Sequence, residues 1–119
     1  MNKNSDQKNT ELETYINIIT SIAGSSASQI EGVASVSFEV GLSNNLFDFG
    51  KNKKNQAIEV RINNDNMVII DMSINVYYGY KIPYLICELQ EKIKHNVEEQ
   101  TYFKIKNINV TVVGVVARH

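Results

Sequence analysis

The chain has 119 residues, of which 43% are hydrophobic and 21% are charged, and its formal net charge at pH 7 is −1. This composition is typical of a soluble globular protein, and the length predicts a single domain. The near balance of 12 basic and 13 acidic residues excludes a strongly basic or acidic protein, and with it a surface dominated by attraction to nucleic acid.

The N-terminal region predicts an unstructured segment followed by a helix. Residues 1–9 are polar and show no hydrophobic period, which is typical of a disordered lead, so we expect the single domain to span residues 10–117. Thr10 and Glu13 match a capping box at a helix start, and Gly32 is suited to a left-handed helix end. Between them, apolar residues recur at helical spacing at positions 12, 15, 16, 19, 22, 23, 27 and 30.

Three strands are expected next. Alternation of apolar and polar residues predicts strands over about 34–40, 58–62 and 67–78, with a long link at 41–56. The turn-forming residues 63–66 between the last two predict an antiparallel hairpin.

A second helix and a final strand complete the chain. Apolar spacing predicts a helix from residue 82 to about 100, with Pro83 in its first turn. The last strand, about 106–116, is expected to place Ile108, Val110, Val112 and Val116 on one face. The order α-β-β-β-α-β predicts an α+β two-layer sandwich, with two helices packed on one face of a mixed four-stranded sheet.

Cellular location is predicted from two observations. The N-terminus lacks the apolar core of a secretory signal, and the longest apolar stretch, Val110–Ala117, is far shorter than the roughly 20 residues that span a bilayer. The single cysteine, Cys87, also excludes an intramolecular disulfide. We therefore expect a cytoplasmic protein without a membrane span.

No arrangement of residues in the sequence predicts catalysis. Cys87 and His95 would lie about 12 Å apart along the second helix, beyond hydrogen-bond reach. The adjacent Glu98 and Glu99 would point about 100° apart. Metal sites need several converging Cys, His or carboxylate ligands, which the pattern does not supply. We predict no catalytic residues, no metal and no organic cofactor.

Two candidate surfaces remain. On the sheet face opposite the helices, alternation places an apolar set among polar residues: Ile69, Tyr77, Val113 and Val115. Scattered apolar residues on an exposed sheet are normal, and a face for self-association or for a partner is the alternative; both interpretations remain open. The second surface is the basic cluster Lys51, Lys53 and Lys54, a candidate contact for phosphate or anionic lipid. Three charges fall short of the roughly four to eight that are typical of lipid-binding segments, which favours a solvated loop.

Several short segments, taken in order, resemble a known family. They are Ile22-Ala-Gly24, Glu31-Gly-Val-Ala34, Ala57-Ile-Glu-Val-Arg61, Val76-Tyr-Tyr-Gly79, Ile82-Pro83 and Val110-Thr-Val-Val-Gly-Val115. Over about residues 10–116, their order and spacing are similar to those of the alkaline-shock-protein type of envelope stress response family of Gram-positive bacteria.

The resemblance implies a non-catalytic cytoplasmic protein of envelope homeostasis. It implies a protein that self-associates into a homo-oligomer and is held at the membrane by a membrane-anchored relative, and some members are linked instead to control of fatty-acid synthesis. It supplies no catalytic residues. The alternative is a KH-like nucleic-acid-binding module, because helices over one face of a small sheet are typical of that fold. That module needs a Gly-x-x-Gly loop and a basic groove, which the sequence does not show, so we do not expect nucleic acid to be the ligand.

Overall fold

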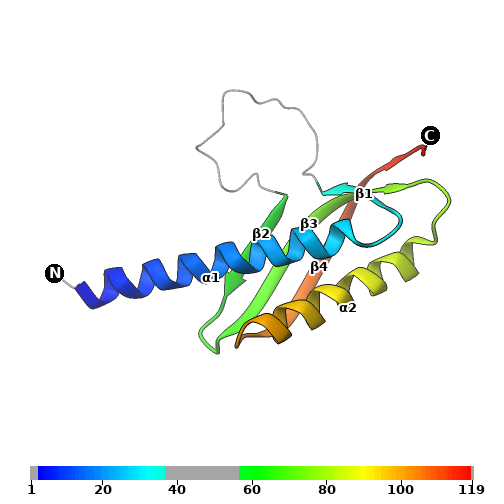
Figure 1. Cartoon of the computed structure of the whole chain (residues 1–119). Coiled ribbons are helices and arrows are strands. Elements are labelled where there is room, and N and C mark those ends of the chain that lie inside the picture. The colour runs from blue at the N-terminus through cyan, green and yellow to red at the C-terminus, as the bar shows by residue number, and fades with distance from the viewer. Residues whose placement is uncertain (1–2, 37–56, 119) are drawn as a thin grey trace, which may run out of the picture.

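Two helices lie on one side of a four-stranded sheet in the computed structural model, which describes residues 3–36 and 57–118 (Figure 1). The elements are α1 (Lys3–Ser28), β1 (Val33–Val36), β2 (Ile58–Ile62), β3 (Met67–Tyr77), α2 (Ile82–Gln100) and β4 (Lys104–Val116). The predicted α+β class and element order are confirmed. The second helix has the predicted bounds, with Pro83 in its first turn.

The long strand β3 organises the sheet. β4 pairs parallel with β3 along its whole length, from Met67 to Tyr77. β2 pairs antiparallel with Val68–Met72, and β1 pairs antiparallel with Ile74–Val76. Because β4 occupies one edge of β3, the shorter strands β2 and β1 follow one another along the other edge. The sheet is therefore mixed, and the predicted hairpin of β2 and β3 is confirmed.

The core lies between this sheet and the helices. Every second residue of β3 is at most 2% exposed, and so are the residues of α1 that face the sheet most closely. The contributors are Val68, Ile70, Met72, Ile74 and Val76 from β3, Ile19, Ala23 and Ala27 from α1, and Leu85, Leu89, Ile93 and Val97 from α2. Burial of each large aliphatic side chain contributes roughly 1.5–3 kcal/mol. The buried residues of α2 recur every four residues, so they form one apolar stripe along the helix. This stripe packs on the same side of the sheet as α1.

A buried polar contact joins the helices. The Ser26 hydroxyl, only 1% exposed, donates to the Ile22 carbonyl at 2.7 Å and accepts a hydrogen bond from the Asn96 amide of α2 at 2.8 Å. Because both polar groups have partners, Ser26 is buried without the cost of an unsatisfied hydroxyl. With Ala23 and Ala27 beside it, this small side chain belongs to the contact between α1 and its neighbours.

The start of α1 differs from the prediction. The helix begins at Lys3, so the expected start at Thr10 is wrong, and residues 3–9 are helical and not a disordered lead. Thr10 does not cap the helix; its carbonyl accepts the Thr14 hydroxyl at 3.0 Å, as in a helix interior. Extending a formed helix costs much less than starting one, so a polar segment without a hydrophobic period can continue it.

The connection from α1 to β1 also differs. α1 ends at Ser28, and Gly32 lies in the turn that follows, with φ of 110°. β1 covers Val33–Val36, and the rest of the expected first strand, 37–40, lies outside the described residues.

Substitution of Gly32 tests this turn. Gly32→Ala is expected to lower the free energy of unfolding by about 2 kcal/mol, because its positive φ strains an L residue and its Cβ would lie 2.6 Å from Leu85 Cδ1. Gly79→Ala is the matched control, since Gly79 has φ of 104° but no described atom within 4 Å of that position. Urea unfolding followed by circular dichroism measures both, and equal losses would contradict the packing argument.

Candidate functional site

The sheet face opposite the helices is the candidate site, and we call it the open face. No described element covers it (Figure 1). Its members on β3 are the residues that alternate with the core, and all six are partly exposed. They are Met67, Ile69, Asp71, Ser73, Asn75 and Tyr77.

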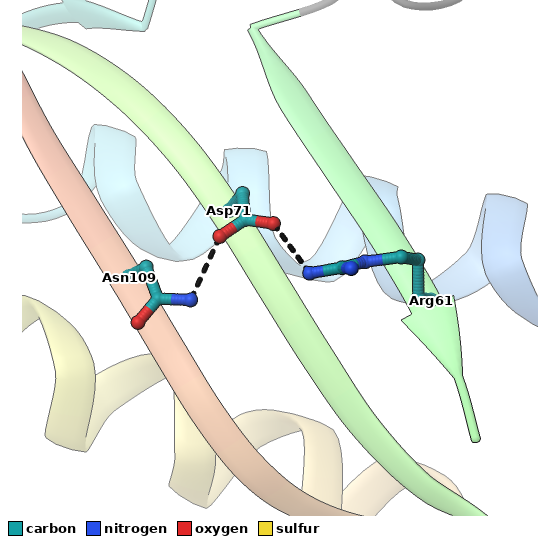
Figure 2. A network of polar contacts seen from close by, with 3 residues as sticks. All are labelled: Arg61, Asp71 and Asn109. Carbon is teal, nitrogen blue, oxygen red and sulfur yellow. Dashed lines mark hydrogen bonds and ion pairs between the residues drawn. The ribbon is translucent and has the colours of Figure 1, made fainter.

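A polar network crosses the middle of the open face (Figure 2). The Arg61 guanidinium of β2 lies 2.7 Å from one Asp71 oxygen of β3, and the Asn109 amide of β4 donates to the other at 2.7 Å. Glu59 lies directly opposite Asp71 in the ladder and Arg61 lies opposite Ile69, so Arg61 reaches Asp71 diagonally. The side chains of the ion pair are 52% and 39% exposed, so its contribution to stability is at most about 1 kcal/mol.

Two irregularities in β4 change which residues reach the open face. Val68 and Ile69 pair with Ile105 and Asn107, and Ile74 and Asn75 pair with Val112 and Gly114. One extra residue is therefore inserted at Lys106 and another at Val113, as in a β-bulge.

The second insertion corrects one predicted residue. After it, Val115 pairs with the fully buried Val76, so Val115 lies on the side of the sheet that faces the helices and not on the open face. Val116 pairs with Tyr77 and takes the open-face position that alternation assigned to Val115. The prediction that Val116 shares a face with Ile108 and Val110 is wrong for the same reason.

The structure divides the predicted apolar set. Tyr77 and Val116 are paired at one end of the sheet, with the inserted Val113 three residues before Val116. Ile69 is on the open face as predicted, but it lies eight residues from Tyr77 along β3, about 26 Å at the rise of an extended strand. The predicted four residues therefore do not form one patch.

The end of the open face near Tyr77 carries a cluster that sequence reasoning missed. The Arg118 guanidinium lies 4.5 Å from the Tyr77 ring centroid and 5.9 Å from that of Tyr80. Arg118 also donates to the Tyr80 hydroxyl at 3.4 Å, and that hydroxyl donates to a Glu31 carboxylate oxygen at 3.0 Å. Such contacts hold an arginine fork in place while leaving most of its donors free.

We call this cluster the aromatic end and define it by Tyr77, Tyr78, Tyr80, Val116 and Arg118. Tyr78 and Val116 are 80% and 39% exposed, and the Tyr78 amide donates to the Val116 carbonyl at 2.8 Å. The available signal in the sequence was the group of three tyrosines at 77, 78 and 80, together with an arginine two residues after Val116.

The other residues that the sequence singled out do not come together in a site within the described part of the chain. Lys51, Lys53 and Lys54 lie outside the described residues. Cys87 is a free, exposed thiol on α2, and His95 contacts Glu99 at 3.1 Å. Among the residues whose side chains the structure describes, 10–36 and 57–118, no three His, Cys, Asp or Glu side chains are placed to hold a metal ion. Over residues 3–36 and 57–118, no helix has the length and apolar character needed to cross a membrane.

Comparison with known proteins identifies the family. Residues 4–117 match the model of the alkaline shock protein 23 family, which is described as having a cell envelope-related function. The chain belongs to this family. The resemblance predicted from the sequence is thus confirmed, and with it a relation to the cell envelope at the level of the family.

Similar proteins carry no assigned activity. The chain is 30% identical over 115 residues to the uncharacterized protein YqhY of Bacillus subtilis strain 168, covering 92% of this chain and 82% of that protein. It is 28% identical to the uncharacterized protein Spy1614 of Streptococcus pyogenes serotype M6, covering 87% and 86%. It is 26% identical to Spy1535 of the same organism, covering 84% and 74%. No solved structure matches the chain.

Titration of Tyr80 tests the aromatic end. Partial desolvation and the hydrogen bond to Glu31 raise the pKa of Tyr80 above its ordinary value of about 10, while Arg118 acts in the opposite direction. Glu31→Gln is therefore expected to lower the pKa of Tyr80, and Arg118→Gln to raise it further. The neutral phenol is favoured in the folded state, so its contribution to stability is present below about pH 10 and lost as the pH rises through the folded-state pKa.

The measurement is ultraviolet absorbance against pH, taken as the difference between each protein and its Tyr80→Phe counterpart. Shifts of the same sign in Glu31→Gln and Arg118→Gln would contradict the described cluster.

Proposed function

We propose that the protein is a non-catalytic, cytoplasmic component of the cell envelope system that acts by binding proteins, first of all other copies of itself, through the open face. The observation that carries this proposal is the aromatic end: Tyr77 and the 39% exposed Val116 are paired on a sheet face that no described element covers, and Arg118 lies over the Tyr77 ring. Tyrosine and arginine are enriched among the residues that dominate binding energy at protein interfaces.

The strength of this contact is bounded by the area available. Burial of a few hundred Å² of apolar surface, at about 25 cal/mol per Å², gives several kcal/mol before the entropy of association is subtracted. The middle of the open face adds little, because Arg61, Asp71 and Asn109 already satisfy one another. A weak oligomer therefore fits the surface better than an obligate one.

A second protein partner belongs to the same proposal. The family resemblance implies a membrane-anchored relative or a component of lipid synthesis, and membership in an envelope-related family supports a partner at the envelope. Nucleic acid is not proposed as the ligand, because a net charge of −1 offers little counterion release to drive phosphate binding.

Sedimentation of three proteins tests the proposal. The wild type is expected to associate weakly with rising concentration, and Val116→Lys is expected to shift sedimentation to the monomer, because it places a charge beside Tyr77. Val115→Lys is the matched control: it changes the neighbouring, similarly exposed residue on the opposite side of the sheet. Circular dichroism verifies that each variant is folded.

Two outcomes would contradict the proposal. One is a wild type that stays monomeric at high concentration. The other is equal loss of association in the two lysine variants, which would show that the open face is not what binds.

A further inference from the structure

The outer edge of β4 is a second surface of interest. β4 pairs with β3 on one side, and no described strand pairs with its other side. Between the irregularities at Lys106 and Val113, residues 107–112 keep an unbroken register with Ile69–Ile74. This stretch is a regularly paired segment of edge strand six residues long.

Side chains of α2 bond backbone groups of β4. The Gln90 amide donates to the Ile108 carbonyl at 2.8 Å, and the Ile105 amide donates to a Glu98 carboxylate oxygen at 2.9 Å. Only these two backbone groups of β4 are bonded by α2 side chains within the described part of the chain. From Val110 to Val112, no described side chain bonds the backbone. An edge left in this condition offers donors and acceptors to another extended chain.

A groove runs between α2 and this edge. It has a volume of about 330 Å³ and is lined by Gln90, Glu91 and Lys94 of α2 and by residues 105–109 of β4. A helix beside an unpaired edge strand is an arrangement that binds extended peptides, since the edge supplies main-chain hydrogen bonds and the groove receives alternate side chains.

The charges around the groove are mainly positive. Lys94 and Lys106 line it, and Lys104 is exposed two residues before Lys106. No ion pair involves any of these three within the described ranges. The Glu98 carboxylate, which accepts the Ile105 amide, adds one negative charge nearby. Glu91 is the one carboxylate among the lining residues. The groove is therefore complementary to a segment that carries negative charge.

We propose that the edge of β4 binds an extended, acidic peptide segment of a partner protein, which adds to the sheet as a strand beside residues 107–112. Its acidic side chains would enter the groove toward Lys94 and Lys106, and its alternate apolar side chains would lie on the opposite side of the added strand. The Gln90 amide would be displaced from the Ile108 carbonyl by a main-chain amide of the segment. This surface is distinct from the open face of the proposed function.

The probe is a capped six-residue peptide of alternating valine and glutamate. Titrated into the full-length protein, it is expected to bind saturably and to slow hydrogen exchange of backbone amides within 107–112, as followed by NMR. The same peptide N-methylated on every residue, so that neither of its edges carries a main-chain donor, is expected to bind at least about tenfold more weakly, since each lost hydrogen bond costs roughly 1 kcal/mol.

Charge variants test the groove itself. Lys94→Glu combined with Lys106→Glu is expected to weaken binding of the acidic peptide about tenfold at low salt, because attraction becomes repulsion at both positions. Lys81→Glu and Val116→Lys change exposed residues outside the groove, and both are expected to leave binding unchanged. Val116→Lys also separates this surface from self-association.

Three results would overturn the proposal. The first is absence of binding to the folded wild type. The second is equal affinity for the N-methylated peptide, which would mean that charge alone holds it. The third is protection of 107–112 that rises with protein concentration without peptide, which would assign the edge to a second copy of this chain.

Discussion

The burial pattern of β3 is the constraint on which the rest of the structure depends. Its alternate residues from Val68 to Val76 are almost completely buried, and all three other strands pair with it. Because side chains alternate strictly along a strand, burying this set commits both helices to one side of the sheet. The open face follows directly. So does the free edge of β4, because β3 has only two edges and β4 takes one of them in full.

Sequence periodicity was sufficient to predict an element and its bounds where one regular hydrophobic period runs through the whole element. The bounds of α2, the hairpin of β2 and β3, and the class and order of elements follow from apolar spacing and turn residues. The prediction was wrong where the hydrophobic period is interrupted or absent. The insertion at Val113 exchanges the faces predicted for Val115 and Val116, and nothing in a run of valines marks the extra residue. Gly114, which pairs with Asn75 next to the irregularity, was the one local hint.

The candidate site was predictable as a face but not as a set of contacts. Alternation placed Ile69 and Tyr77 on the open face correctly. The network of Arg61, Asp71 and Asn109 spans three strands, so it requires the register between strands, which a single sequence does not provide. The position of Arg118 over Tyr77 likewise joins the end of the chain to the end of β3, and it depends on the corrected register of Val116.

The distribution of polar groups restricts where this domain can bind another protein. Covering the middle of the open face would remove water from the ion pair of Arg61 and Asp71, and the loss of hydration opposes the gain from new contacts. At the aromatic end, Val116 and the ring of Tyr77 are apolar, so covering them costs less hydration than covering an ion pair, and Arg118 is the charged group beside them. At the edge of β4, Gln90 and Glu98 satisfy two backbone groups near its start. The two proposed contacts, at the aromatic end and along the middle of the β4 edge, therefore use separate surfaces on one small sheet.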